Sequence, residues 1–335
     1  MPKRILIVEV NWIGDVLFST PFIRAVREAN PGAHIACLVH PRCAEMLEGN
    51  PRLNEIVVYD EEGAHRSLWG KARLAADLRR GRFDTAFILH RSFTKALLTM
   101  LSGISERIGY ATKGRGWVLT RPIEEPPAPI HKVEYFLNIA REAGIPAEKK
   151  SYEFFITGGD RDYIKGLLAN SGVVPDNKIV VICPGGNWDP KRWPRDKYAK
   201  LADRIAELYG AKIVIAGAKK DIALADEIRS LMDSEPVITC GRTTLKQLAA
   251  LFEASDLVVA NDTGPMHLAV AMKAKTIALF GPTSAELTGP YGGNNYKVIS
   301  AGTDCAVPCY DTTCKVNRCM DAISVDDVMA EIKNL

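Results

Sequence analysis

A short polar turn near residue 262 carries the residue types of an anion-binding site. An apolar run over 258–260 predicts the end of a buried parallel strand, and an apolar helical pattern resumes at Leu268. Pro265 suits the first turn of that helix, where its missing N–H costs nothing. The free amides and positive dipole of a helix start attract anions. We therefore expect a bound phosphate with a polyhydroxy group beside it; a capped turn without a ligand is the alternative. The predicted contacts are Asp262, Thr263, Gly264 and His267.

A second polar turn, Asn11-Trp12-Ile13-Gly14-Asp15, follows the first apolar strand. Gly14 allows a tight turn and close approach of a ligand. Asp15 stands at the mouth of the next helix, and a carboxylate partly removed from water is poised to act as a general base. A helix cap without a catalytic role is the alternative for Asp15. Because the turn lacks three spaced glycines, it does not match the dinucleotide-binding fingerprint.

A third turn, over residues 183–194, combines glycines with cations. Gly185 and Gly186 expose backbone amides at a strand end, and Lys191 and Arg192 supply charge for a diphosphate leaving group. No Gly-Lys-Ser/Thr sequence is present in the turn, so it is not a P-loop. Because these cations can stabilise the leaving group, we expect a metal-independent reaction with no metal and no cofactor.

These turns need a scaffold, and the apolar patterning predicts one. Strand-like runs alternate with amphipathic helical runs from end to end, which is typical of doubly wound parallel sheets. Strands are expected over 5–8, 34–39, 55–59, 85–89, 107–110, 179–183, 212–216, 237–238, 257–260, 276–280 and 296–299. Helices are expected over 16–28, 41–48, 68–79, 94–101, 132–143, 195–209, 223–232, 245–253, 266–272 and 324–334.

The chain of 335 residues is long enough for two domains. Proline-rich residues 112–130 break the alternation and predict a long loop. We place the domain boundary within 158–176, which gives an N-terminal domain over 1–160 and a C-terminal domain over 172–335 with a cysteine-bearing tail and a final helix. Two doubly wound α/β domains facing across a cleft hold ligands at the carboxyl ends of their strands, where the three polar turns lie.

Composition excludes several classes of protein. The formal net charge of +3 excludes a strongly basic nucleic-acid binder. No stretch approaches the roughly 20 apolar residues of a membrane span, and the run before Glu9 is too short for a signal peptide. We therefore expect a cytoplasmic protein whose contact with a membrane is peripheral.

Four cysteines cluster near the C-terminus, but their spacing differs from the paired Cys-x-x-Cys of most zinc sites. We expect loosely packed thiols, with a structural metal or a disulfide clip as the alternative. They are Cys305, Cys309, Cys314 and Cys319.

The order of the motifs resembles the ADP-heptose:lipopolysaccharide heptosyltransferases of glycosyltransferase family 9. The motifs are Asn-x-x-Gly-Asp after the first strand, Pro-Gly-Gly-x-x-x-x-Lys-x-Trp-Pro opening the second domain, Asp-Thr-Gly-Pro-Met-His-Leu, and Gly281-Pro282-Thr283-Ser284 one strand later. The resemblance covers essentially the whole chain. It implies a GT-B fold and an inverting transfer of heptose from ADP-L-glycero-D-manno-heptose to Kdo or a preceding heptose of the lipopolysaccharide inner core.

The resemblance also implies roles for individual residues. Asp15 matches the general base of the family, and Lys191 matches the lysine that meets the donor phosphate. Gly186 and Asn187 stand where some relatives carry hydroxyl residues, and Asp221 and Thr243 match nucleotide-side positions loosely. The implied donor contacts are Gly14, Gly185, Gly186, Asn187, Asp221, Thr243, Asp262, Thr263, Gly264 and His267.

The acceptor implied by the resemblance, lipid A carrying Kdo, is anionic and calls for cations. We expect Arg66, Lys95 and Arg115 of the first domain to bind it, with a solvated basic surface as the alternative. The nearby Trp69 and Trp117 suggest peripheral contact with the cytoplasmic face of the inner membrane.

Three other functions stay open at this stage. They are a related transferase using another nucleotide sugar, a nucleotide-sugar epimerase, and a non-catalytic two-lobed sugar- or nucleotide-binding protein. The presence of both Asp15 and Lys191 favours an enzyme over a binding protein. Asn11-Trp12-Ile13 favours the type that adds the second heptose.

Overall fold

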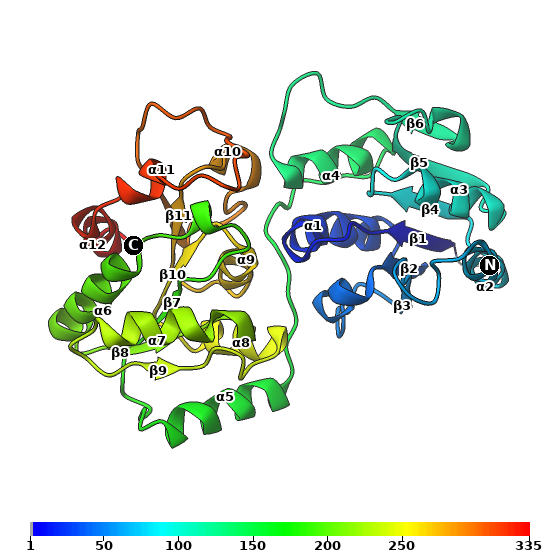
Figure 1. The fold of residues 1–335 in the computed structure, drawn as a ribbon. Coiled ribbons are helices and arrows are strands. Elements are labelled where there is room, and N and C mark those ends of the chain that lie inside the picture. Colours follow the sequence, from blue (N-terminus) through cyan, green and yellow to red (C-terminus); the bar gives the residue numbers. More distant parts are fainter. Residues whose placement is uncertain (1–2) are drawn as a thin grey trace. The chain divides into compact units, whose positions relative to one another are not determined.

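The computed structural model describes residues 3–335 and divides into two compact units, Met1–Phe155 and Ile156–Leu335 (Figure 1). Helix α5 (Gly158–Asn170) packs on α8 (Leu245–Glu253) and so belongs to the second unit. The chain therefore changes unit just before α5. In each unit the described strands form one six-stranded sheet, and all the pairings are parallel.

The sheet of the first unit has the strand order β3-β2-β1-β4-β5-β6. Its strands are β1 (Arg4–Val8), β2 (His34–Val39), β3 (Glu55–Val58), β4 (Thr85–Ile88), β5 (Glu106–Tyr110) and β6 (Arg121–Ile123). Helices α1 (Ile13–Ala29) and α4 (Lys132–Glu142) pack against each other, whereas α2 (Leu68–Arg80) and α3 (Phe93–Leu101) share a core with β1 (Figure 1). Because helices cover it, β1 reads as a continuous apolar run.

Two segments of the first unit differ from the sequence-based expectation. Residues Pro41–Met46 form a 3-10 helix, η1, instead of an α-helix. The expected loop over 112–130 contains a short 3-10 helix, η2 (Gly116–Val118), and the strand β6. Pro122 is tolerated in β6 because this is an edge strand, where one side of the backbone needs no ladder partner.

The second unit has the strand order β12-β11-β10-β7-β8-β9. Its strands are β7 (Ile179–Cys183), β8 (Lys212–Ile215), β9 (Val237–Ile238), β10 (Leu257–Asn261), β11 (Thr276–Phe280) and β12 (Tyr296–Ser300). Its other helices are η3 (Asp189–Lys191), α6 (Arg195–Tyr209), η4 (Lys219–Asp221), α7 (Ile222–Ser230), α9 (Gly264–Ala271), α10 (Ala285–Thr288), α11 (Arg318–Asp321) and α12 (Val325–Lys333). Helix α6 ends at Gly210, whose φ of 63° is the left-handed conformation that glycine adopts at helix ends.

The strand order places a topological switch point in each sheet. The chain builds the first sheet outward from β1 to β3 and then returns to place β4 on the other side of β1. It does the same in the second sheet with β7 to β9 and then β10. Ligands of doubly wound sheets bind at such points, beside the carboxyl ends of the strands. The turns after β1, β4, β7 and β10 are therefore the places to look for a site.

Within residues 3–335, no helix combines the length and the apolar character needed to cross a membrane.

Candidate active site

An ion pair occupies the switch point of the second unit. Nζ of Lys191, at the end of η3, lies 2.6 Å from Oδ2 of Asp262, and it is 5.0 Å from the centroid of the Trp188 ring. Thr283, after β11, donates from Oγ1 to the same carboxylate oxygen at 2.6 Å. The Asp262 side chain is only 7% exposed, so the pair is largely shielded from water. Three turns thus converge on a cation at the carboxyl edge of the sheet.

The start of α9 offers the backbone N–H of Gly264 to an anion. Thr263 is the N-cap residue, but its hydroxyl donates to the carbonyl of Asn261 at 3.2 Å instead of accepting from the helix. The helix has no side-chain cap, but the N–H groups of Met266 and His267 donate to the Thr263 carbonyl at 3.1 and 3.4 Å. Because Pro265 has no N–H, the Gly264 amide is the first-turn group that remains for a ligand. His267 is buried one turn further along α9. Its predicted contact with the donor stays a prediction, as do those of Thr263 and Gly264.

Asp221 lies next to two glycine turns of the second unit. Its side chain is buried, and its Oδ2 accepts a hydrogen bond from the backbone N–H of Ala218 at 2.9 Å. A Cβ atom on Gly185 would come within 2.7 Å of the carboxylate, and one on Gly217 within 3.0 Å. Asp221 therefore lies against the two glycine turns, and its contact with the donor stays a prediction.

The remaining donor candidates lie around the same edge of the second sheet. Gly186 accepts at its carbonyl from the Arg192 guanidinium at 2.9 Å, and the side chain of Asn187 accepts from Lys220 Nζ at 2.8 Å. Thr243 is half-buried, directly before the residue that caps α8. Contact of these three residues with a ligand stays a prediction.

In the first unit, Asp15 lines a pocket of about 150 Å³ at the switch point beside β1 and β4. Gly14 and Asp15 lie in the first turn of α1, whose N-cap is Trp12, so Asp15 is not the helix cap. Burial raises the pKa of Asp15, and the nearby Lys132 ammonium partly opposes that shift. A carboxylate with a raised pKa is a stronger base than a solvated one, as general-base catalysis requires. The polar residues of the pocket are Asn11, Asp15, His90, Arg91, Lys132 and Tyr135.

Burial, together with nearby cations, lowers the pKa of His90 to about 3. Its Nδ1 accepts from the backbone N–H of Ser92 at 2.9 Å. A side chain with so low a pKa is a weak proton acceptor, which leaves Asp15 as the candidate base of this pocket.

Two of the three expected acceptor contacts are buried structural groups. Lys95 is 1% exposed, and its ammonium donates to Asn11 Oδ1 at 2.6 Å and to the carbonyl of Glu9 at 3.2 Å. Arg115 is fully buried and donates to the carbonyls of Tyr110 and His90. The expectation that Lys95 and Arg115 face an acceptor is therefore corrected: both hold the backbone and side chains around the pocket. Only Arg66 is exposed among the three.

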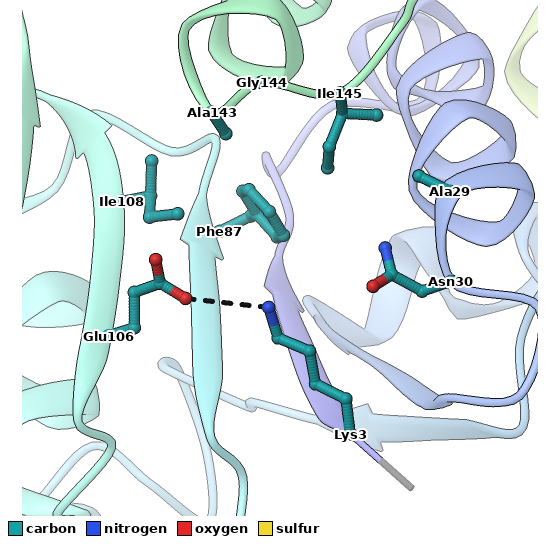
Figure 2. A pocket seen from close by; sticks show the side chains of 9 residues that line it. All are labelled: Lys3, Ala29, Asn30, Phe87, Glu106, Ile108, Ala143, Gly144 and Ile145. Atoms are coloured by element: carbon teal, nitrogen blue, oxygen red, sulfur yellow. Dashed lines mark ion pairs between the residues drawn. The ribbon is translucent and has the colours of Figure 1, made fainter.

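A second pocket, of about 210 Å³, lies at the opposite, amino-terminal edge of the first sheet (Figure 2). Lys3 and Glu106 form an ion pair across it, with Nζ 3.7 Å from Oε2. None of the predicted site residues lines this pocket. It lies away from the carboxyl ends of the strands and is not the candidate site.

Comparison with known proteins assigns the chain to a family. The family model described as glycosyltransferase family 9 (heptosyltransferase) matches residues 71–320. The chain belongs to glycosyltransferase family 9. It is 28% identical over 301 residues to lipopolysaccharide heptosyltransferase 2 of Escherichia coli (strain K12), covering 86% of this chain and 85% of that protein. The family and the enzyme class predicted from the motifs are confirmed.

Solved structures agree on the fold. The glycosyltransferase family 9 protein of Veillonella parvula DSM 2008 superposes with a TM-score of 0.89 at 23% identity, over 99% of this chain and 96% of that one. The E. coli ADP-heptose LPS heptosyltransferase II gives a TM-score of 0.81 at 24% identity, over 99% and 98% of the two chains. This family 9 glycosyltransferase therefore has the predicted GT-B fold of two Rossmann-like domains.

Sequence reasoning missed Asn261, the last residue of β10 in this family 9 enzyme. The side chain is fully buried, and its Nδ2 donates to the carbonyls of Pro184 and Gly185 at 2.8 and 3.2 Å. Its Oδ1 accepts from the backbone N–H of Trp193 at 3.2 Å and from Tyr198 Oη at 3.0 Å. Asn261 thus holds the glycine turn after β7 onto β10. The available signal was a polar residue closing an apolar strand.

Glu9, just beyond β1, was also missed. It is fully buried, and burial raises its pKa to about 7, although hydrogen bonds from the Ser19 hydroxyl and the Val10 N–H oppose the shift. Ser19 lies one turn along α1 from Asp15, so a second acidic group lies close behind the candidate base. In the sequence, the only sign of Glu9 was a single charged residue at the end of an apolar run.

The cysteine-bearing tail packs against the donor turns. The Cys309 N–H donates to the carbonyl of Pro282 at 2.6 Å, and Asn317 donates to the carbonyl of Arg192 at 3.1 Å. The Tyr310 ring meets the Trp188 ring edge-on, with the centroids 6.4 Å apart. Among residues 3–335, no group of three or more His, Cys, Asp or Glu side chains is arranged to hold a metal ion.

Proposed function

We propose that this enzyme transfers heptose from ADP-L-glycero-D-manno-heptose to the inner core of lipopolysaccharide, with inversion at the anomeric carbon. The observation that carries the proposal is the Lys191–Asp262–Thr283 cluster at a switch point, in a chain of family 9. Relatives that are lipopolysaccharide heptosyltransferases support the donor and the acceptor. The E. coli structure of TM-score 0.81 is an ADP-heptose LPS heptosyltransferase.

In the proposed reaction, Asp15 takes the proton of an acceptor hydroxyl. The hydroxyl oxygen attacks the anomeric carbon of the heptose on the face opposite the nucleotide. The bond from that carbon to the phosphate oxygen breaks, and its electron pair leaves with ADP. Lys191 and the Gly264 amide at the start of α9 stabilise the charge that grows on the diphosphate. No step needs a metal.

We assign the donor to the C-terminal domain and the anionic acceptor, Kdo or heptose, to the N-terminal one. The exposed Arg66 precedes α2, which begins with Leu68 and Trp69, and these two side chains are 84% and 87% exposed. A cation beside apolar side chains suits an anionic amphipathic surface. The enzyme would thus work in the cytoplasm, in peripheral contact with the inner membrane.

The test is incubation with ADP-heptose and defined acceptors ending in Kdo or in one heptose, with products read by mass spectrometry. Addition of one heptose with release of one ADP is the expected result. Because the 28% identical relative is a heptosyltransferase 2, we expect the acceptor that already carries one heptose to be preferred. Transfer from another nucleotide sugar only would contradict the donor assignment. Tight binding of ADP-heptose without any ADP release would indicate a binding protein.

A further inference from the structure

The buried Lys95 fixes the orientation of the Asn11 side chain. Its Nζ lies 2.6 Å from Asn11 Oδ1. An ammonium group only donates hydrogen bonds, so the amide must turn its oxygen to the lysine and its NH2 group away from it. Among residues 3–335, no protein group accepts a hydrogen bond from Asn11 Nδ2. A donor with a fixed direction is therefore left without a protein partner.

That donor belongs to the pocket that holds the candidate base. Asn11 and Asp15 both line it, and they lie on either side of the N-cap residue Trp12 in one turn. Asn11 is half-buried and lines the pocket, and its Oδ1 is held by Lys95, so its NH2 group is the part of the amide that remains for a ligand. A carboxylate that only accepts and an amide that donates together match a hydroxyl group, which donates one hydrogen bond and accepts others.

Burying the ammonium group of Lys95 costs free energy, and its position therefore needs an explanation. It is 1% exposed and lies in the first turn of α3, where the helix dipole disfavours a positive charge. Its charge is paired with Glu61, whose Oε1 is 3.5 Å away, and it lies 5.7 Å from the centroid of the Tyr59 ring. Lys95 does not stabilise α3 and is not a solvated surface residue. Orienting the Asn11 side chain accounts for its position.

We propose that Asn11 contacts the acceptor and that Lys95 is its positioning residue. This rests on the proposed function. Asn11 Nδ2 donates to the oxygen of the hydroxyl whose proton Asp15 removes. As the proton leaves, negative charge grows on that oxygen, and the hydrogen bond from the amide strengthens. Asn11 thus acts on the nucleophile as an oxyanion-hole donor acts on a tetrahedral intermediate.

The test compares Asn11→Ala, Lys95→Met and the double variant under saturating ADP-heptose, with Lys95→Arg as the charge-preserving control. Loss of one oxyanion-type donor costs about 10²–10³-fold in kcat, which is the fall expected for Asn11→Ala with donor Kd unchanged. Lys95→Met should lower kcat about tenfold or more, and Lys95→Arg should restore part of it. Because Lys95 acts through Asn11, the double variant should be no slower than Asn11→Ala alone.

Two results would overturn the inference. One is wild-type kcat in Asn11→Ala. The other is an equal loss from Lys95→Met whether or not Asn11 is present, which would give Lys95 an independent or merely structural role. Because Asn11 is only half-buried, we expect Asn11→Ala to fold. The kcat of this variant tests the inference even if Lys95→Met does not fold. Failure of the proposed function is distinguishable, because the wild-type enzyme itself would then bind ADP-heptose without turnover.

Discussion

The chemistry proposed for single residues rests on how each charge is partnered. Asp15 is half-buried with one cation near it, so its pKa is raised but its carboxylate stays open to the pocket. Lys191 has a carboxylate partner at 2.6 Å and an aromatic face beside it. From these environments we expect Asp15 to act as the base and Lys191 to bind the phosphate, so substitutions of the two residues should have different effects.

Asp15→Asn should lower kcat by about 10²–10⁴-fold while the donor Kd is unchanged, because a base is lost and no phosphate contact is. In the wild type, activity should fall as the pH drops through the raised pKa of Asp15, since the base is active only when ionised. Lys132→Met removes a charge that lowers this pKa, so the acidic limb of kcat/KM against pH should move to higher pH. If the acidic limb of kcat/KM against pH is the same in Lys132→Met and in the wild type, the assignment of Asp15 as the base is contradicted.

At the scale of elements, the strand ends determine which turns meet. Asn261 closes β10 and holds the turn after β7, so the donor turns depend on one amide. Glu9 follows β1 and lies buried behind α1. Asn261 links two neighbouring strand ends, and Glu9 links β1 to α1, so both should affect stability more than surface residues do.

Asn261→Leu should destabilise the protein by roughly 2–5 kcal/mol, because the apolar side chain leaves buried carbonyl, amide and hydroxyl groups without partners. It should also weaken ADP binding, since the glycine turn is no longer held. Urea unfolding and calorimetric titration with ADP measure the two effects. Lys220→Ala, which removes an exposed contact to the same turn, is the matched control. Wild-type stability in Asn261→Leu would refute the anchoring role.

Glu9→Gln should change how stability depends on pH. With a folded pKa of about 7 against an ordinary value of 4.5, the native state binds the proton more tightly, so wild-type stability falls as the pH rises from 4.5 through 7. Glutamine carries no titrating proton, and the variant should avoid a loss of about 3 kcal/mol. Urea unfolding at pH 5 and pH 8 measures the difference. Parallel pH dependences of the two proteins would contradict the burial of an ionisable Glu9.

The sequence predicted the elements well because their apolar periods are long and their turns carry glycine and charge. It predicted the turns at residues 15, 191 and 262 because chemistry needs recognisable residue types there. It could not predict that Lys95 reaches Asn11, 84 positions away, or that Asp221 lies under Gly185. Such contacts depend on how segments far apart in the sequence pack against each other. The local pattern of apolar and polar residues carries no information on that packing.

For the whole molecule, the near-neutral charge leaves membrane contact to local features. Trp69→Ser should reduce co-sedimentation with phosphatidylglycerol vesicles several-fold, because Trp69 is 87% exposed beside Leu68 and Arg66. Leu101→Ser is the control. Leu101 is 55% exposed, but it is the last residue of α3 and lies towards the amino-terminal ends of the strands, whereas α2 begins at their carboxyl ends. Equal loss in both variants, or in neither, would argue against a specific membrane face.

The ion pair between Lys191 and Asp262 has a consequence for which anions can enter. Because the carboxylate already neutralises the lysine, a small free anion such as sulfate or inorganic phosphate meets no net positive charge there. A phosphate group that binds Lys191 must therefore displace Asp262 from the ammonium group, and the carboxylate then keeps its hydrogen bond from Thr283. We expect this displacement to weaken the binding of a lone phosphate more than that of a nucleotide sugar, which has further contacts with the protein.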